Sequence, residues 1–379
     1  MVSETVTLPL ERIDPEQAGL DPGRMAKLCA LVQRHVDAGR YLGAQMAMAR
    51  DGRLALFRSF GRARAEPEAP VSDETMFLLF SQTKPIVAAT VWTLVERGLC
   101  RFADRIAEHI PGFERHGKGA ITLFDVMTHQ CGFPNANVPD EAWADHELLR
   151  RSVCDFTLEW TPGERVQYHG GSAHWVLAVL IEALTGQDYR QVVREVICEP
   201  LALRNLFVGV PAAEHGRLAH IHRLEEDRHV SVAERNRPAF YEAGVPGGGG
   251  YAGAADLAAF YQMLCHGGAL NGVRILSPRM VQFVTRNWTA DRIDHNMGMP
   301  MHRGLGVHVR GYTPTIRGLG TIASPATFGH GGAGTSYSWA DPETGVSFSY
   351  LTNTSMPEPD HTARLDIVSS MAHACIERL

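Results

Sequence analysis

A serine and a lysine lie three positions apart in the stretch FLLFSQTKPIVAAT, residues 77–90. Pro85 is tolerated only near the first turn of a helix, so we expect a helix that begins close to Ser81 and ends before Gly98. Residues three apart share a helical face, which brings the Ser81 hydroxyl within reach of the Lys84 amine. A serine becomes a nucleophile when a neighbour takes its proton, and a buried lysine can do so. The pair therefore indicates nucleophilic chemistry, although a polar first turn on a surface helix would show the same pattern.

The composition is that of a globular protein. The 379 residues are 45% hydrophobic and 21% charged, with a net charge of −6. No basic stretch stands out, so we expect no nucleic-acid partner. The apolar runs at 85–95 and 175–184 are too short to span a membrane. Residues 1–17 lack the apolar core of a secretory signal, and the seven cysteines include no CxxC pair, so we expect a cytoplasmic protein with reduced thiols.

Extended segments are predicted near both ends of the chain. Residues 43–61 form two short runs around the turn Asp51-Gly52, and residues 335–353 form two more around 341–345. Helices are predicted at 22–38, 82–97, 122–129, 172–185, 255–266, 278–286 and 360–378. This distribution predicts an antiparallel sheet built from both chain ends, with a mainly helical domain inserted between them.

Five stretches in chain order resemble the serine hydrolases related to class C β-lactamases, DD-peptidases and family VIII carboxylesterases. The first is FSQTKPI, which is similar to their S-x-x-K motif. The others are ITLFDVMTHQCGF (121–133), TPGERVQYHGGSAHWVLAVLIEALTG (161–186), PGGGGYAGAADLAAFYQML (246–264) and FGHGGAGTSYSWADPETG (328–345). Together these blocks cover most of residues 20–355, which makes the resemblance far more specific than S-x-x-K alone.

The resemblance implies an α+β fold of the class C β-lactamase type. Residues 1–75 and 320–379 would form a discontinuous domain whose antiparallel sheet is flanked by helices. Residues 76–319 would form the mainly helical inserted domain, with the active site at the interface. The expected partner is a small-molecule ester or amide substrate, with no cofactor and no catalytic metal, and the oligomeric state is left open.

The resemblance also implies a mechanism. Ser81 would attack a carbonyl carbon and form an acyl-enzyme. Lys84 and Tyr168 would share the role of general base, since the lysine cation favours the phenolate of a neighbouring tyrosine. His330, either protonated or as a hydrogen-bonding group, would add to this effect. Tyr168 would then protonate the leaving group and activate water for deacylation.

An oxyanion hole is implied at the same place. Its donors would be the backbone N–H of Ser81 and a second N–H from the strand after His330, which we assign to Ala333. Gly331 and Gly332 would let a substrate lie against that strand without meeting side chains.

Two positions depart from the pattern of the resembled family. Gly170 stands where an asparagine is expected two residues after Tyr168, and that asparagine contacts the substrate amide in the β-lactamase relatives. His330 stands where those enzymes carry lysine, as in DD-peptidases and D-aminopeptidases, and family VIII esterases often have tryptophan there. We therefore do not expect an efficient β-lactamase.

Several activities fit the same three residues. Ester cleavage needs less help for the leaving group than amide cleavage, but the motifs do not separate the two. We favour a carboxylesterase or transesterase on small esters, because this activity is common in the resembled family. An amidase or D-aminopeptidase-like enzyme is the first alternative, and a sensor that is acylated once without turnover is the second. Specificity is predicted to depend on segments 135–155, 225–247 and 287–318, the last of which contains NMGMPMHRGLG.

Several other polar groups are not assigned to catalysis. His129 is expected to bond backbone near the site, and the roles of His169 and His174 are left open. The histidines of residues 214–229 match no zinc-binding spacing, so a metal enzyme is disfavoured. GGSAH at 170–174 lacks the last glycine of G-x-S-x-G, which disfavours a conventional α/β-hydrolase.

Overall fold

The computed structural model describes residues 8–226, 228–313 and 318–378. Residues 1–7, 227, 314–317 and 379 lie outside this described part. They belong to the predicted sheet-domain ranges and to the predicted specificity segments 225–247 and 287–318, so those predictions refer to the other residues of these ranges.

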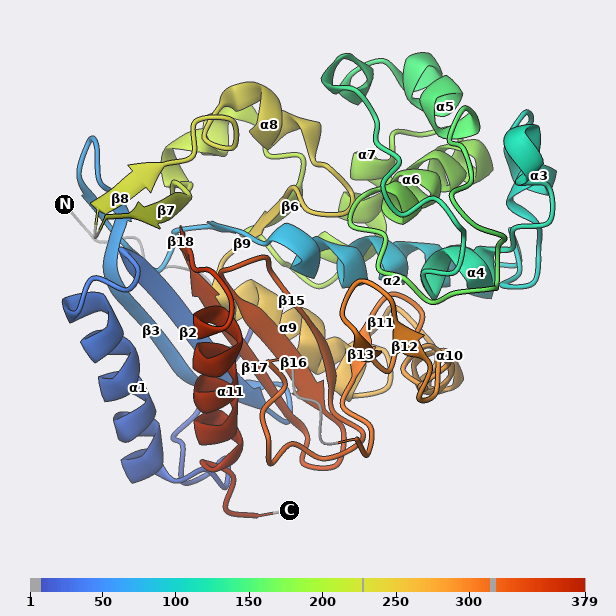
Figure 1. Ribbon diagram of the computed structural model, residues 1–379. Coiled ribbons are helices and arrows are strands. Elements are labelled where there is room, and N and C mark those ends of the chain that lie inside the picture. Colours follow the sequence, from blue (N-terminus) through green and yellow to red (C-terminus); the bar gives the residue numbers. More distant parts are fainter. Residues whose placement is uncertain (1–7, 227, 314–317, 379) are drawn as a thin grey trace.

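A large, mostly antiparallel sheet contains strands from both ends of the chain (Figure 1). The strand order is β1-β3-β2-β17-β16-β15-β14, and β4 pairs with β3. The strands are β1 Glu11–Arg12, β2 Gly43–Arg50, β3 Arg53–Arg64, β4 Ala69–Pro70, β14 His308–Val309, β15 Phe328–Gly331, β16 Tyr337–Asp341 and β17 Val346–Thr352. Strand β2 therefore pairs with β17 from the other end of the chain, as predicted, and the α+β class is confirmed.

The alternation of side chains along β2 gives the sheet two apolar faces. Met46 and Met48 belong to one buried cluster, whereas Ala47 and Ala49 belong to another. Helices α1 (Pro22–Asp37) and α11 (Asp360–His373) cover the methionine face, and α9 (Ala254–Cys265) packs on the alanine face. Figure 1 shows α1 and α11 side by side in front of the sheet with α9 behind it. The small alanines allow α9 to approach closely.

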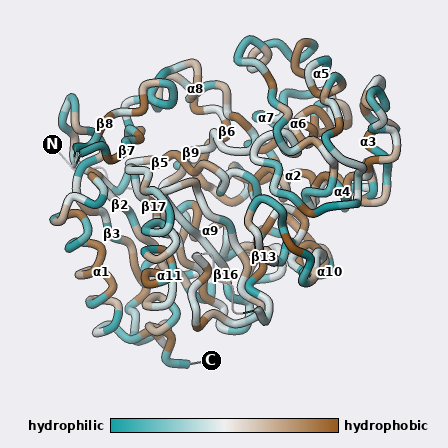
Figure 2. Tube along the Cα trace, in the orientation of Figure 1, coloured by the Kyte–Doolittle hydropathy of each residue, from teal (hydrophilic) through white to brown (hydrophobic). Residues whose placement is uncertain are grey.

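Helix α1 begins and ends where its sequence predicts. The Asp21 carboxylate accepts the N–H of Arg24, Pro22 occupies the first turn, and Gly39 follows with φ 68°. The buried residues Met25, Leu28 and Val32 recur every three or four positions, so hydrophobic and hydrophilic residues alternate around the helix (Figure 2).

The helical region is packed around α2 (Thr83–Glu96) and α6 (Ser172–Thr185). Its other helices are α3 Ile106–His109, α4 Leu123–Met127, α5 His146–Cys154, α7 Tyr189–Val193, α8 Pro238–Ala243 and α10 Pro278–Val284, and a π-helical turn at Arg194–Cys198 extends α7. Residues 83–94 of α2 are all buried. Helix α2 is therefore a central helix that is covered on every side along these residues.

A small sheet places the start of α2. Strand β9 (Gly250–Ala252) pairs with β5 (Phe77–Leu78) and with β6 (Leu206–Val208). The short helix η1 (Phe80–Gln82) directly follows β5 and contacts β15 of the large sheet. The remaining strands are β7 His222–Glu225, β8 Arg228–Ser231, β10 Ala269–Leu270, β11 Val273–Arg274, β12 Ile293–Asp294, β13 Met299–Pro300 and β18 Thr354–Ser355. The nucleophile segment thus lies where the small sheet meets the large one.

The predicted division into two domains stays a prediction. Helix α9 and strand β14, both within 76–319, pack on or join the large sheet, whereas α2, α3, α4, α5 and α7 contact α6. Within the described ranges, no helix is long and apolar enough to cross a membrane.

Candidate active site

Ser81 and Lys84 meet at the junction of η1 and α2. The Nζ atom of Lys84 lies 3.1 Å from the Oγ atom of Ser81. The two residues occupy successive turns, so the predicted i,i+3 contact is present. Phe80, directly before the serine, has φ 46°, a conformation that is rare for an aromatic residue. This backbone turn places Ser81 at the wall of two cavities.

Lys84 is fully buried and is held by backbone carbonyls. Its Nζ donates to the carbonyl oxygen of Gly170 at 2.7 Å and to that of Gly247 at 2.6 Å. Burial lowers the pKa of Lys84, the neighbouring Tyr168 opposes this effect, and the charge of Arg303 lowers the pKa further. The amine is thus fixed in direction and can lose its proton more readily than a surface lysine.

Tyr168 reaches the same serine from the loop before α6. Its hydroxyl lies 2.8 Å from Ser81 Oγ, and Lys84 Nζ lies 5.0 Å from the centre of its ring. The predicted trio of Ser81, Lys84 and Tyr168 is therefore brought together around one hydroxyl, although residues 81 and 168 are far apart in sequence. Their catalytic roles stay predictions.

Two proton arrangements fit these heavy atoms. With Lys84 as ammonium, its third proton points to Ser81, and the serine donates to a Tyr168 phenolate. With Lys84 as neutral amine, its two protons go to the carbonyls of Gly170 and Gly247, and the serine donates to its lone pair while accepting from the Tyr168 phenol. Either arrangement removes the serine proton as Oγ attacks a carbonyl carbon, so this trio can activate a nucleophile.

His330 lies in β15, on the other side of Tyr168. The centre of its ring is 6.2 Å from that of the Tyr168 ring. The ring stacks on that of His308, with 4.0 Å between the two centres. Burial lowers the pKa of His330 well below its usual value, and the charges of Lys84 and Arg303 act in the same direction. A protonated His330, one of the two roles predicted for it, does not fit this environment. Its Nδ1 instead lies 2.9 Å from the carbonyl oxygen of Gly331.

The predicted oxyanion residues lie in and after the end of β15. Gly331 closes the strand, and Gly332 and Ala333 begin the turn in which Thr335 N–H donates to the Gly332 carbonyl. Ala333 is exposed and borders the same cavity as Ser81. A Cβ atom on Gly332 would lie 2.6 Å from the Leu79 carbonyl oxygen, so this position requires glycine for β15 to approach the nucleophile segment. The oxyanion hole itself stays a prediction.

Two cavities meet at Ser81. The first, of about 290 Å³, lies on the side of Tyr168. It is bordered by residues 330–334, by side chains of α11, and by Met297 and Met301. The second, of about 410 Å³, lies on the side of Gly170 and is bordered by Trp143, Trp175 and two arginines. We call them the tyrosine-side cavity and the glycine-side cavity. All three predicted specificity segments contribute lining residues: 135–155 and 225–247 to the glycine-side cavity, and 287–318 to the tyrosine-side cavity.

Gly170 leaves the glycine-side cavity open. A Cβ atom placed on Gly170 would meet no atom within 4 Å, so the missing asparagine side chain has left space rather than been replaced by a neighbour. Gly247 is different, because its Cβ would lie 3.1 Å from the Gly170 carbonyl oxygen and 3.4 Å from Lys84 Nζ. The glycine run at 247–250 is thus part of the lysine's enclosure.

Three buried histidines lie behind Tyr168. His129 Nδ1 accepts the backbone N–H of His169, which confirms the predicted backbone contact, and its ring centre is 4.9 Å from that of Tyr168. The His169 ring bonds backbone groups of Gln167 and Phe133. Burial lowers the pKa of His129, His169 and His174, so all three are neutral supports around neutral pH.

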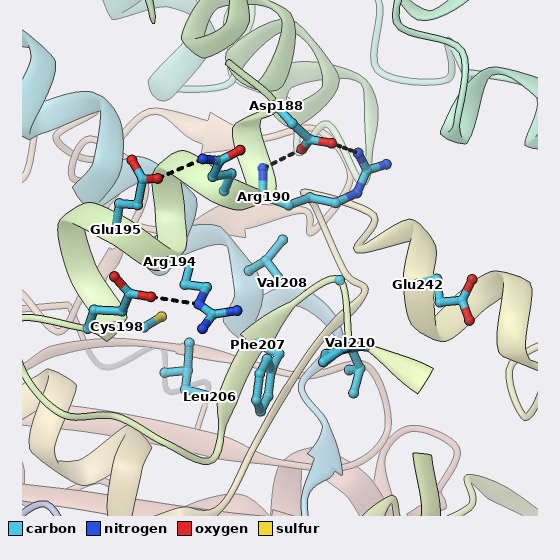
Figure 3. A pocket seen from close by; sticks show the side chains of 14 residues that line it. Asp188, Arg190, Arg194, Glu195, Cys198, Leu206, Phe207, Val208, Val210 and Glu242 are labelled. Carbon is cyan, nitrogen blue, oxygen red and sulfur yellow. Dashed lines mark hydrogen bonds and ion pairs between the residues drawn. The ribbon is translucent and has the colours of Figure 1, made fainter. Parts of the chain in front are cut away.

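A larger cavity, of about 520 Å³, lies elsewhere, between α7, β6 and α8 (Figure 3). Four of its charged side chains form two ion pairs, Arg190 with Asp188 and Arg194 with Glu199. Burial raises the pKa of the Cys198 thiol to about 12, so this cavity offers no ready nucleophile. In the described part of the chain, no three His, Cys, Asp or Glu side chains form a group that could hold a metal ion.

Sequence reasoning missed several groups at the site. The carbonyls of Gly170 and Gly247 hold Lys84, yet a backbone acceptor carries no residue-type signal. The buried ion pair of Arg303 and Asp294, in which the guanidinium carbon is 4.9 Å from the centre of the Tyr168 ring, was also missed. Neither residue stands out in the sequence, because the same segment also contains Asp291, Arg292 and Arg310.

A sheet from both chain ends, a set of helices packed around α2 and α6, and a Ser-Lys-Tyr cluster at the start of α2 define a β-lactamase-fold serine hydrolase. The model of the Beta-lactamase family matches residues 28–371, and the chain belongs to this family.

Named relatives include an esterase and a penicillin-binding protein homologue. The chain is 28% identical over 343 residues to the Esterase/beta-lactamase LipL of Mycobacterium tuberculosis, covering 83% of this chain and 77% of the relative. A penicillin-binding protein homologue from Caulobacter crescentus superposes with a TM-score of 0.82 at 25% identity, over 94% of this chain and 99% of the other. A family VIII carboxylesterase gives a TM-score of 0.81 at 24% identity, over the same shares, which shows a common fold.

Proposed function

We propose that this protein is a carboxylesterase that acts on small esters through an acyl-enzyme on Ser81. The contact of Ser81 Oγ with both Lys84 Nζ and the Tyr168 hydroxyl carries this proposal. As Oγ attacks the ester carbonyl, its proton passes to the Lys84–Tyr168 pair. When the C–O bond breaks, Tyr168 returns a proton to the leaving alcohol, and water later enters by the reverse route.

The two cavities assign the two halves of the ester. Tyr168 is the proton donor to the leaving group, and it borders the tyrosine-side cavity but not the glycine-side cavity. The alcohol therefore leaves through the tyrosine-side cavity, and the acyl chain occupies the glycine-side cavity. This assignment gives each cavity a distinct substrate requirement.

The tyrosine-side cavity favours an ester with an uncharged alcohol over a peptide with a free carboxylate. Among the described residues, its lining includes Met297, Met301 and Leu365 but no lysine or arginine, and Glu358 stands at its border. A carboxypeptidase expels an amino acid whose carboxylate would meet Glu358 without a cation to pair with. This lining supports the esterase over the peptidase alternative.

The decisive experiment compares wild type with Ser81→Ala on p-nitrophenyl esters of short acids. We expect Ser81→Ala to lose about three orders of magnitude or more in kcat, because the nucleophile is gone. Intact mass spectrometry of wild type should show an acyl adduct that Ser81→Ala lacks. Ser152→Ala is the matched control, because the Ser152 hydroxyl bonds only the Leu148 carbonyl within α5.

Each alternative has its own outcome. Full activity in Ser81→Ala would refute the whole assignment. An adduct that forms once and never clears would indicate the acylated sensor, and turnover of D-amino amides above that of esters would indicate the amidase. Transfer of the acyl group to an added alcohol in preference to water would indicate a transesterase.

A further inference from the structure

The charge environment of Tyr168 differs from what its sequence motif predicts. A tyrosine that accepts the serine proton needs positive charge beside its ring. His330 occupies the position where the β-lactamase relatives carry lysine, but it is buried, stacked on His308 and kept neutral at neutral pH. One permanent cation is therefore missing from β15.

A cation from another segment lies over the same ring. The guanidinium carbon of Arg303 is 4.9 Å from the centre of the Tyr168 ring, a separation nearly equal to the 5.0 Å of Lys84 Nζ. Arg303 is 1% exposed, so water does not screen it, and a guanidinium stays charged when buried. The ring is thus accompanied by two cations from different parts of the fold.

Arg303 is held in place by partners on all three of its guanidinium nitrogens. Its Nε and Nη2 donate to Asp294 at 3.1 and 2.5 Å, and its Nη1 donates to His308 Nε2 at 3.1 Å. The Arg303 backbone N–H donates to Thr289 Oγ1 at 2.9 Å. Because arginine has donors only, His308 must accept through Nε2, and its other nitrogen faces the Tyr337 hydroxyl at 3.2 Å.

Asp294 connects this ion pair to the tyrosine's backbone. Its Oδ1 accepts the N–H of Tyr168 at 3.3 Å and that of Asn296 at 3.0 Å. The His295 N–H donates to the Val166 carbonyl at 2.9 Å, so segment 294–295 is docked along the loop that carries Tyr168. The carboxylate therefore sits at the main-chain end of the tyrosine, and the guanidinium sits over its ring.

We propose that Arg303, fixed by Asp294, is a positioning residue that holds Tyr168 against Ser81 and supplies the permanent positive charge that His330 does not provide. This inference rests on the proposed function, since it assumes that Tyr168 exchanges a proton with Ser81. The ion pair as a whole is neutral, and its guanidinium end lies over the ring. The Arg303 charge lowers the pKa of Lys84, so it favours release of the proton that the Lys84–Tyr168 pair exchanges with Ser81. The charged or titratable groups that face Tyr168 from the packed elements are Lys84, His129, Asp294, Arg303 and His330.

The test is the pH dependence of kcat/KM on a p-nitrophenyl ester. Its acidic limb reports the Lys84–Tyr168 pair as a whole. In the double variant Asp294→Asn/Arg303→Gln, which removes both charges and keeps amide hydrogen bonds, we expect the limb to move up by about one pH unit. At pH values below the midpoint of this limb, kcat/KM of the double variant should be about tenfold lower than that of wild type. At high pH the two values should be equal. Arg303→Lys keeps the positive charge next to Asp294, so its acidic limb should stay close to that of wild type.

Asp294→Asn alone should shift the acidic limb in the opposite direction. It leaves the Arg303 charge uncompensated, so we expect the acidic limb to move to lower pH. If the double variant does not fold, this single variant decides, and a limb that stays in place or moves up overturns the inference. Thermal unfolding of each variant shows which of them are folded.

The control is Arg292→Gln. Arg292 also anchors the loop before Tyr168, through the carbonyls of Gly163 and Glu164, but it is not placed over the ring. It should leave the limb unmoved. A uniform loss at every pH in the double variant would show a purely structural role and overturn the inference. Activity in Ser81→Ala would instead refute the proposed function, so the two failures are distinguishable.

Discussion

At the scale of single residues, Lys84 shows how a lysine can act as a base inside a protein. Its two shortest contacts are carbonyl oxygens, which are acceptors only, so two of its protons have fixed directions. The remaining direction points to Ser81. Burial lowers the pKa of Lys84 because the site disfavours the charged form, yet the carbonyls keep that form within reach. The residue is therefore suited to losing and regaining one proton.

Glu358 gives the first residue-scale prediction. We expect wild type to prefer phenyl acetate over 3-carboxyphenyl acetate, because the leaving carboxylate approaches Glu358 at the tyrosine-side cavity. Glu358→Gln should narrow this preference by about two- to fivefold in kcat/KM at low ionic strength, as expected for an exposed charge. Steady-state kinetics with the two esters measure the ratio.

The matched control is Glu234→Gln, which removes a carboxylate from the glycine-side cavity. It should leave the ratio for the two leaving groups unchanged. If Glu234→Gln changed the ratio as much as Glu358→Gln, the assignment of the alcohol to the tyrosine-side cavity would be wrong.

At the scale of elements, the junction of η1, α2 and β9 sets the position of the nucleophile. The Thr83 hydroxyl donates to the Phe80 carbonyl at 2.7 Å and accepts the Gly250 N–H at 2.9 Å. It thus joins the strained residue before Ser81 to the neighbouring strand. A Cβ atom on Gly250 would lie 2.9 Å from this hydroxyl oxygen, which explains why glycine stands there.

Thr83→Val tests this junction. The variant keeps the shape of the side chain but leaves the Gly250 N–H without its partner. The Phe80 carbonyl loses the hydroxyl donor and keeps the backbone N–H of residue 83. We expect the free energy of unfolding to fall by about 1–3 kcal/mol. We also expect kcat/KM to fall by about ten- to a hundredfold, since Ser81 is no longer held in line. Urea unfolding and ester kinetics measure the two effects.

Thr83→Ser supplies the comparison, because serine keeps the hydroxyl. It should stay close to wild type in both measurements. Equal behaviour of the valine and serine variants would mean that the hydroxyl does not hold the junction.

Local signals predicted the elements, and non-local contacts explain what they missed. Asp21-Pro22 marked the start of α1, and Asp51-Gly52 marked the β2–β3 turn, with φ 52° and 73°. These depend on one or a few residues. By contrast, the docking of segment 294–295 along the Tyr168 loop depends on backbone partners far apart in sequence. Periodicity and spacing carry no information about such pairings.

At the scale of the whole molecule, the chain order of the motifs predicted the α+β fold, but residue types could not predict burial. His330 was expected either to carry charge or to form a hydrogen bond, and only the packing of β15 against η1 and His308 shows that it is neutral. The same holds for the other buried histidines. Their protonation state depends on how fully the surrounding elements exclude water.

These buried histidines connect the fold to pH. Burial lowers the pKa of His35, His169 and His373 to about 4 and lowers those of His129, His174 and His330 well below their usual value. A histidine with a lowered folded-state pKa binds fewer protons in the native than in the unfolded protein. Its contribution to stability is therefore complete above pH 6.5 and is lost as the pH falls toward 4. Asp256 acts in the opposite direction, since burial raises its pKa to about 6.

A comparison at two pH values isolates one of these groups. His373 stacks on Trp339 at 3.9 Å, and its Nε2 lies 2.9 Å from the Leu319 carbonyl oxygen, on the far side of the sheet from α9. Glutamine can keep that hydrogen bond but cannot be protonated. We expect His373→Gln to have a lower free energy of unfolding than wild type at pH 7. This difference between the two proteins should be smaller by about 2 kcal/mol at pH 5. Urea unfolding at each pH measures it, with the exposed His116→Asn as a control whose gap stays constant. A constant gap for His373→Gln as well would show that protonation of this buried ring does not limit the acid stability of the protein.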